Sequence, residues 1–271
     1  MNERELFAFL KTKGAHAKKS LGQHFLINPN ISKKIVEALQ IQKSDKILEI
    51  GAGFASLSYF LAQNPAQLTL LDVDIDAIKF LKNLFIQQTN VDVIEGDVLL
   101  HDLKSYDLIV GNIPYYLTKH IIQHILLSAY KTRRAILMLQ KEASEKLFTQ
   151  TNDKDFNPLA ILINYLGEIK KVMHVSKNNF SPSPSVDSVI IQIDLTKKVK
   201  KEKLSEFYYF LNKLFLHKRK TIHNNLSKAI GNSKQSEDVL ECLQIDKNKR
   251  PHELSLDEYL LLFNNLNVKK S

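Results

Sequence analysis

The chain lacks the features that several large protein classes require. Among its 271 residues there is one cysteine, Cys242, which excludes an internal disulfide and favours a reducing compartment. No apolar run reaches about 18 residues and no signal-like apolar segment is visible. We therefore expect a cytoplasmic protein that neither spans a membrane nor is exported. The nine histidines show no metal-ligand spacing such as C-x-x-C or H-E-x-x-H, so no metal site is expected.

Acidic residues are fewer than basic ones, 29 against 38, which gives a formal net charge of +9. Most of the excess lies between Lys197 and Lys220, where nine basic residues face two acidic ones. Such a basic segment favours a polyanionic partner, and Lys218, Arg219 and Lys220 are candidate phosphate contacts. The alternative for these side chains is a solvated linker or helix surface.

Short β-rich runs alternate with helical periods over the first two-thirds of the chain, which predicts an α/β fold. Alternation at this spacing indicates right-handed crossovers and a mostly parallel sheet covered on both faces. Strands are expected at 46–50, 68–72, 91–94, 107–111 and 135–140, and helices at 54–63, 74–87, 118–128 and 141–150.

The pattern changes after this alternating region. Residues 169–175 and 188–194 are expected to form an antiparallel pair closing the sheet, joined through 180–185, where two prolines disfavour regular structure. Only helical patterns follow the lysine-rich segment 196–203. We therefore divide the chain into domains at 1–196 and 197–271, with no role assigned to the N-terminal extension 1–17. The later helices are expected at 204–216, 221–229, 235–243 and 255–266.

Small and acidic residues follow three successive predicted strands. Gly51 and Gly53 come directly after the first strand, where a backbone without Cβ can turn sharply and approach a ligand. Asp72 ends the second strand about 20 residues later, the usual place for a carboxylate that binds ribose hydroxyls. Asp97 follows the third strand. Because the carboxyl ends of parallel strands meet at one edge, these residues predict a crevice for a nucleoside-containing cofactor.

Two residues distinguish between the possible cofactors. A dinucleotide-binding loop normally has a third glycine, which is missing here because Phe54, Ala55 and Ser56 follow Gly53. Glu49, just before Gly51, would repel a pyrophosphate at close range. S-adenosylmethionine carries no phosphate and needs no anion cradle, so the sequence favours this sulfonium cofactor. The alternative is an NAD(P)-dependent oxidoreductase.

Asn112-Ile113-Pro114-Tyr115 follows the fourth strand and suits methyl transfer to an exocyclic amine of a base. That amine is a poor nucleophile because its lone pair is delocalised into the ring. The Asn112 side-chain oxygen and the Ile113 carbonyl can accept its two protons and shift the nitrogen towards sp3. Pro114 biases Ile113 towards an extended conformation, and Tyr115 offers an aromatic face for stacking.

These motifs belong to a longer ordered set that resembles the small-subunit ribosomal RNA adenine N6-dimethyltransferases. The resemblance implies a Rossmann-like class I methyltransferase sheet with a small C-terminal all-helical, RNA-binding domain. It also implies N6,N6-dimethylation of two adjacent adenosines in a hairpin loop near the 3′ end of 16S rRNA, by a monomer. The matching blocks are 19–26 (KSLGQHFL), 49–53 (EIGAG), 95–97 (EGD), 111–115 (GNIPY), 140–142 (QKE), 180–188 (FSPSPSVDS), 217–221 (HKRKT) and 250–254 (RPHEL).

The resemblance assigns cofactor roles to residues in these blocks. His24 and Leu26 are expected to contact S-adenosylmethionine from the N-terminal segment, and Gly51 to lie under its methionine part. Asp72 is expected to bind the ribose hydroxyls and Asp97 the adenine amine.

The catalytic residues that the resemblance implies are Asn112, Tyr115 and Phe180. Asn112 is expected to bridge cofactor and target, and the rings of Tyr115 and Phe180 to enclose the flipped-out adenine. Two departures from the family pattern matter here. Relatives often have Glu at Asp72, so the shorter side chain puts cofactor affinity in doubt, and Thr118-Lys119 replaces a more usual pair of small hydroxyl residues.

Two further functions compete with this interpretation. One is a large-subunit rRNA adenine methyltransferase of the antibiotic-resistance type, but residues 217–221 and 250–254 favour the small-subunit group. The other is a non-catalytic ribosome assembly or nucleic-acid-binding factor. The presence of Asn112 and Tyr115 disfavours it, because a pure binder needs no amine-polarising pair.

Overall fold

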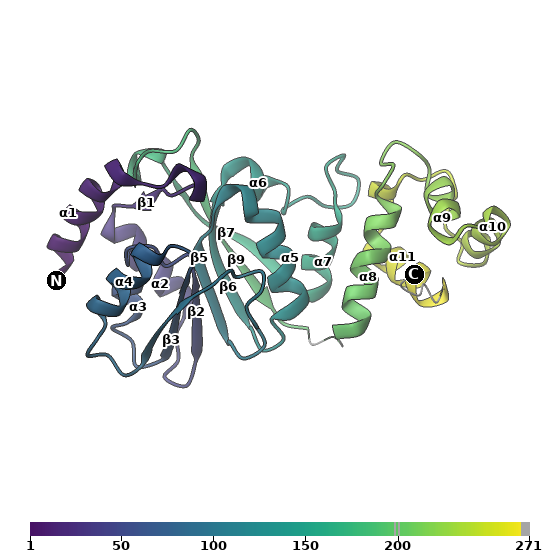
Figure 1. The fold of residues 1–271 in the computed structure, drawn as a ribbon. Helices are drawn as coiled ribbons and strands as arrows, with labels where there is room; N and C mark the ends of the chain where they lie inside the picture. The colour runs from purple at the N-terminus through teal and green to yellow at the C-terminus, as the bar shows by residue number, and fades with distance from the viewer. Residues whose placement is uncertain (198, 200, 267–271) are drawn as a thin grey trace. The chain divides into compact units, whose positions relative to one another are not determined.

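The computed structural model describes residues 1–197, 199 and 201–266 (Figure 1). The chain divides into two compact units, a sheet unit of residues 1–144 and 168–196 and a helical unit of residues 145–167 and 197–271. Residue 196 is thus the last residue of the sheet unit. Residues 145–167, expected within the first domain, pack in the helical unit because their one long helix is apolar on most of its surface.

The sheet unit contains a seven-stranded sheet with the order β4-β3-β2-β5-β6-β9-β7. Strands β2 to β6 pair in parallel, and β9 pairs antiparallel with β6. The prediction of a mostly parallel α/β sheet is therefore confirmed. The strands are β2 (Lys46–Ile50), β3 (Gln67–Asp72), β4 (Val91–Glu95), β5 (Leu108–Asn112), β6 (Arg134–Gln140), β7 (Gly167–Val175) and β9 (Ser188–Leu195).

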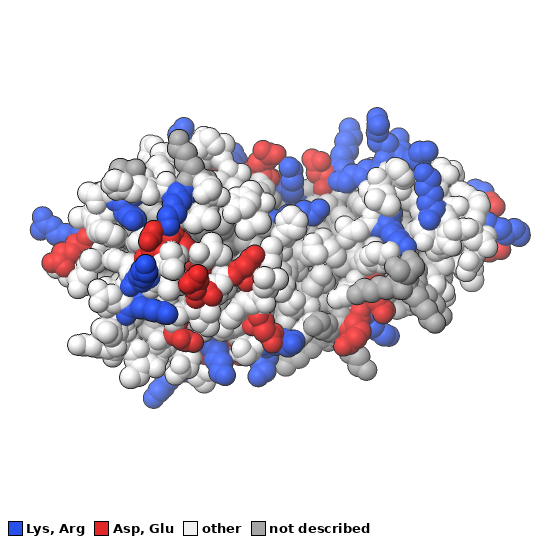
Figure 2. All heavy atoms as spheres, viewed as in Figure 1, with Lys and Arg blue, Asp and Glu red and all other residues white. Residues whose placement is uncertain are grey.

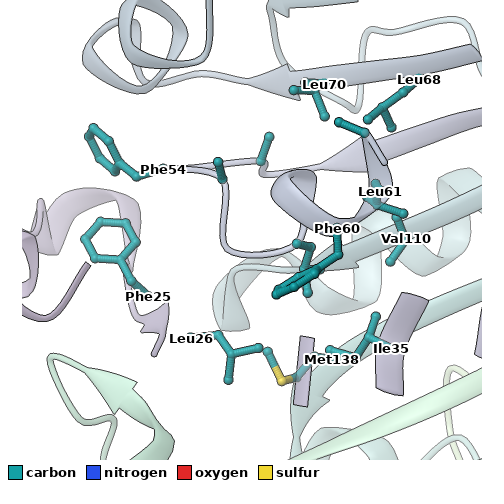
Figure 3. Close-up of a cluster of buried hydrophobic side chains, with 14 of the residues drawn as sticks. Phe25, Leu26, Ile35, Phe54, Phe60, Leu61, Leu68, Leu70, Val110 and Met138 are labelled. Carbon is teal, nitrogen blue, oxygen red and sulfur yellow. The ribbon is translucent and has the colours of Figure 1, made fainter. Parts of the chain in front are cut away.

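Strand order reverses between β2 and β5, which is where a parallel α/β sheet opens a crevice. The chain runs from β2 outward to β3 and β4, then returns to the other side of β2 as β5. Central strands such as β5 and β6 are buried along nearly their whole length, as expected for a sheet covered on both faces. Figure 3 shows part of the resulting core, with Leu68, Leu70 and Val110 of the strands near Phe60 and Leu61.

The helices of the sheet unit differ from the sequence expectation in length. The helix expected at 54–63 is reduced to a short α3, because Ala55 adopts a left-handed backbone conformation that ends any regular helix there. The helix expected at 141–150 is only the five-residue α6. The bounds are α2 (Pro29–Leu39), α3 (Ser58–Leu61), α4 (Ile75–Leu84), α5 (Thr118–Ser128) and α6 (Lys141–Glu145).

The N-terminal extension, to which no role was assigned, forms helix α1 (Glu3–Lys13). A capping box between Asn2 and Glu5 starts the helix, and Leu6, Phe7 and Leu10 bury its inner face. Nearby, β1 (Phe25–Leu26) pairs antiparallel with β8 (Phe180–Ser181). The segment expected to be irregular from 180 thus has two paired residues, and prolines 182 and 184 prevent the strand from continuing.

The helical unit contains α7 (Pro158–Leu166) and the four helices expected after residue 196. Phe207 and Phe210 pack near Phe263, and the buried Tyr259 ring lies next to Phe215. Of the helices that the structure describes, none is long and apolar enough to cross a membrane. Their bounds are α8 (Lys201–Leu214), α9 (Ile222–Ile230), α10 (Ser233–Cys242) and α11 (Leu256–Leu266); short 3₁₀ turns occur at Gly14–His16, Lys19–Leu21, Tyr115–Leu117, Lys177–Asn179 and Pro251–Glu253.

Candidate active site

A crevice opens at the carboxyl ends of β2, β3, β4 and β5, at the point where the strand order reverses. It brings together six of the eight residues predicted for the cofactor and the reaction. Those six are His24, Gly51, Asp72, Asp97, Asn112 and Tyr115.

The loop after β2 forms the floor of this crevice. Gly51 and Gly53 have φ angles of 69° and 53°, and Ala55 has a φ angle of 70°. The Gly51 N–H donates to the Leu71 carbonyl at 2.8 Å, which holds the loop against β3. A non-glycine residue in this conformation costs roughly 1–2 kcal/mol. Ala55 therefore adopts the left-handed conformation at some cost in stability.

Glu49 is a buried carboxyl in the wall of the crevice, with a side chain only 1% exposed. Burial raises the pKa of Glu49 from 4.5 to about 8, and the nearby Ser58 hydroxyl opposes this only in part. Within the described residues, neither Glu49 Oε2 nor Ser58 Oγ has a hydrogen-bond partner. A buried polar atom without a partner is costly, so a cationic group in the crevice would relieve this site.

Asp72 and Asp97, the two carboxylates predicted to contact a nucleoside, both line the crevice. Asp72 accepts hydrogen bonds from the N–H groups of Gly53 at 2.7 Å and Asp74 at 2.8 Å. Burial raises its pKa, while these two N–H donors oppose the rise. Asp97 is exposed, and its Oδ1 accepts from the Leu99 N–H at 2.9 Å. Each carboxylate therefore has acceptor capacity beyond its backbone bonds.

The Asn112 side chain is held at the end of β5 by the N-terminal segment. Its Nδ2 donates to the backbone carbonyl of His24 at 3.0 Å. This bond fixes which way the amide points and leaves Oδ1 available as an acceptor. Among the described residues, Oδ1 accepts no hydrogen bond.

Tyr115 and His24 form an aromatic pair beside Asn112. Their ring centroids lie 5.7 Å apart with 21° between the planes. The Tyr115 hydroxyl lies 3.3 Å from Ser188 Oγ, and burial raises the pKa of the phenol, so it stays neutral at physiological pH. His24 Nδ1 lies 2.8 Å from the Pro182 carbonyl, which can only accept, so Nδ1 carries the hydrogen.

Leu26 and Phe180 are the two predicted site residues that do not line the crevice. They are paired across the β1–β8 ribbon, with side chains 0% and 3% exposed in the hydrophobic core. Their ribbon nevertheless positions the site, because it brings the segment after Phe180 against His24.

Sequence reasoning missed a polar clamp at the mouth of the crevice. Lys18 Nζ lies 2.6 Å from Asp74 and 2.7 Å from Asp76, and Gln23 Nε2 donates to Asp74 at 2.6 Å. Hydrogen bonds to Asp74 and then Asp76 raise the pKa of Lys18 to about 12. The clamp ties the segment that carries His24 to the start of α4. Residues more than 50 positions apart gave no pattern from which to predict it.

The predicted phosphate contacts lie in the turn between α8 and α9, where Lys218, Arg219 and Lys220 are all exposed. Lys198 and Lys200 of the same basic segment lie outside the described residues. The buried Asn225 shapes the turn, because its Nδ2 donates to the carbonyls of His217, Lys220 and Thr221. Figure 2 shows Lys and Arg side chains gathered at this edge of the helical unit.

Among the described residues, no group of three or more His, Cys, Asp or Glu side chains could hold a metal ion. The crevice combines acidic side chains and a glycine-containing loop with an oriented amide and an aromatic ring.

Comparison with known proteins shows which families share this arrangement. Residues 14–268 match the model of the family described as "Ribosomal RNA adenine dimethylase". The chain is 35% identical to ribosomal RNA small subunit methyltransferase A of Mycoplasma capricolum, over 92% of this chain and 97% of that protein. It is 34% identical to the protein of the same name from Enterococcus faecalis, over 96% and 94%.

Two solved structures share the fold over most of their length. A dimethyladenosine transferase from Plasmodium falciparum is 28% identical, with a TM-score of 0.77 over 89% of this chain and 96% of that one. The 23S rRNA methyltransferase ErmE is 22% identical, with a TM-score of 0.66 over 90% and 99%. These methyltransferase structures confirm the predicted Rossmann-like class I methyltransferase fold.

Proposed function

The chain belongs to the ribosomal RNA adenine dimethylase family, and from this we propose that it methylates N6 of adenosines in small-subunit rRNA. Its targets are two adjacent adenosines in a hairpin loop near the 3′ end of 16S rRNA, each converted to N6,N6-dimethyladenosine. The observation that carries the proposal is the Asn112 amide. Its Nδ2 is tied to the His24 carbonyl, so Oδ1 is directed as an acceptor beside an aromatic ring.

S-adenosylmethionine fits the crevice better than a dinucleotide does. The lining includes Glu49, Asp72 and Asp97, and Glu49 has a buried oxygen without a partner among the described residues. Glu49 keeps its proton in the apoprotein up to about pH 8, and a sulfonium or ammonium group would favour its ionised form, whereas a pyrophosphate would not. We infer that Gly51 lies beside the methionine part, that Asp72 binds the ribose, and that Asp97 accepts from the adenine amine.

The residues around Asn112 activate the target amine by accepting hydrogen bonds from its N–H groups. S-adenosylmethionine supplies a methyl group on a sulfonium sulfur, which leaves as a neutral thioether. Asn112 Oδ1 and the Ile113 carbonyl accept hydrogen bonds from the N6–H groups, which favours an sp3 nitrogen whose lone pair can attack the methyl group. Because these acceptors are held by β5 and by His24, they need little rearrangement as charge develops on the nitrogen.

Tyr115 offers its ring to the target base, since it is half-buried and already stacked near His24. Phe180 is the second ring that the family resemblance assigns to this role. Its side chain is 3% exposed, so the β1–β8 ribbon must shift before that ring can meet a base. An RNA loop is a suitable substrate, because an unpaired base leaves its stack at a lower cost than a paired one.

The exposed turn of Lys218, Arg219 and Lys220 supplies phosphate contacts for the same RNA. Its shape is fixed by the buried Asn225, so the three cations are presented by an ordered turn. We further propose that the protein acts as a cytoplasmic monomer.

Two experiments test the proposed function. In the first, calorimetric titration compares S-adenosylmethionine with NAD, and only S-adenosylmethionine should bind. In the second, labelled methyl transfer is measured on small-subunit and large-subunit ribosomal particles, and primer extension maps the modified bases. Label in two adjacent adenosines of 16S rRNA supports the proposal. Label in 23S rRNA would instead assign the large-subunit reaction.

A further inference from the structure

Tyr116 is a large aromatic side chain that lies open to solvent at the mouth of the crevice. Its side chain is 60% exposed, whereas the adjacent Tyr115 is half-buried and bonded to Ser188. Tyr116 belongs to the 3₁₀ turn Tyr115–Leu117 and lines the crevice. The Tyr116 ring thus presents an aromatic surface to solvent beside the crevice.

One edge of the Tyr116 ring faces the turn at Gly22. A Cβ atom added at Gly22 would lie 3.6 Å from Cε1 and 3.7 Å from Cδ1 of this ring, which is ordinary contact distance. Gly22 has a φ angle of 61°, so glycine is the residue that holds this turn without strain. The Tyr116 ring therefore lies beside an ordered turn, and the residue keeps 60% of its surface exposed.

A lysine and a histidine follow Tyr116 closely in the chain. Lys119 and His120 stand three and four residues after Tyr116, in the first turn of α5, and both are exposed. The 3₁₀ turn that holds Tyr116 runs directly into α5, so both side chains follow the ring within four residues. An exposed ring beside a lysine is the combination with which proteins hold single-stranded nucleic acid, where the ring stacks a base and the cation meets phosphate.

We propose that Tyr116 and Lys119 form an outer subsite that stacks the nucleobase next to the target adenosine and contacts its phosphate. The inference rests on the proposed function, because a reaction on two adjacent adenosines keeps one base in the crevice while its neighbour stays outside. Tyr116 directly follows the residue that meets the target base, so its ring is the nearest exposed aromatic surface for that neighbour. The net charge of +9 suits an RNA occupant.

The test measures binding of a fluorescent RNA hairpin that carries the two adjacent adenosines. Tyr116→Ala should weaken binding about 5- to 150-fold, the range for loss of one base–aromatic stack. Tyr116→Phe and Tyr116→Trp should retain affinity, because they keep the ring. The control is Ile86→Ala, which truncates another exposed apolar side chain outside the crevice lining.

An abasic nucleotide beside the target adenosine makes the test specific. Removing that base should weaken binding to the wild-type protein by about the same factor as Tyr116→Ala. It should have little further effect on Tyr116→Ala, since the stack is already absent there. Additive losses would overturn the stacking assignment. A loss seen only on intact ribosomal particles, and not on the naked hairpin, would assign Tyr116 to a protein contact and would also overturn it.

Salt dependence tests the phosphate contact of Lys119. Lys119→Ala should lower the log–log salt slope by about 0.7, as for one phosphate in a single strand. Lys82→Ala, an exposed lysine on α4, should leave the slope unchanged. An unaltered slope in Lys119→Ala would remove this residue from the subsite.

These measurements separate the subsite from the proposed function. If the wild-type protein methylates the RNA while Tyr116→Ala binds it as tightly as wild type, only the subsite is wrong. If the wild-type protein fails to methylate small-subunit RNA but Tyr116→Ala still loses hairpin affinity, the proposed function is wrong and the stacking surface remains.

Discussion

Glu49→Gln is predicted to change how stability and cofactor binding depend on pH. In the folded apoprotein, burial raises the pKa of Glu49 to about 8, against 4.5 for an ordinary glutamate. Between these values the unfolded chain has lost the proton and the folded chain has kept it. Stability must therefore fall as pH rises from about 4.5 to about 8 and level off outside that range.

The size of the effect follows from the same two pKa values. One pKa unit is worth about 1.4 kcal/mol, so the interval from 4.5 to about 8 corresponds to a loss of up to about 5 kcal/mol. The glutamine side chain of the variant is never charged and lacks this dependence. The free energy of unfolding of Glu49→Gln, relative to wild type, should thus increase steadily across the interval. The exposed Glu95 provides the control Glu95→Gln, which should follow the wild-type curve.

The assay is urea denaturation of the apoprotein at a series of pH values, followed by circular dichroism because the chain has no tryptophan. A second readout is calorimetry of S-adenosylmethionine binding in buffers of different ionisation enthalpy. Positive charges in the crevice favour ionised Glu49, so binding near neutral pH should release a proton in wild type and not in Glu49→Gln. Parallel stability curves for both proteins, with equal proton release, would refute the role given to this carboxyl.

The other predictions concern single residues of the site and the basic turn. Asn112→Ala should lower kcat by roughly 10²-fold or more while RNA affinity persists. Wild-type turnover of this variant in steady-state kinetics would mean that residues 112–115 form only a structural turn. Asp97→Ala should weaken S-adenosylmethionine binding by about 1–3 kcal/mol in calorimetry, and a loss of RNA affinity instead would mean the acid is misplaced. Tyr115→Ala should reduce RNA methylation with little loss of stability, whereas the buried Phe180→Ala should also cost about 3–5 kcal/mol in denaturation; equal stabilities of the two variants would contradict their different burial. Replacing Lys218–Lys220 with Ala should reduce the log–log salt slope of RNA binding by about 0.7–0.9 for each phosphate no longer neutralised, and an unchanged slope would exclude phosphate binding by this turn.

The parallel sheet could be predicted because each of its strands has a short β-rich run ending at a polar or glycine residue. The helix at 54–63 could not be delimited, since the left-handed conformation of Ala55 is set by the loop and not by local propensity. Helices α1, α2 and α7 were missed. Helix α1 is stabilised mainly by burial of Leu6, Phe7 and Leu10, which the sequence alone does not reveal.

The site was predictable where a residue follows a strand end, because strand order determines which ends meet. The positions of Asp72, Asp97 and Asn112 in the crevice could be predicted for that reason. Side-chain direction and burial depend on tertiary packing, so the inward turn of Phe180 and the raised pKa of Glu49 were not visible in advance.

The most direct measurement is mass spectrometry of 16S rRNA from cells that lack the protein. Loss of N6,N6-dimethyladenosine is predicted, with recovery when the wild-type gene is returned and no recovery with Asn112→Ala. Unchanged dimethyladenosine in 16S rRNA, or a loss confined to 23S rRNA, would contradict the proposed function.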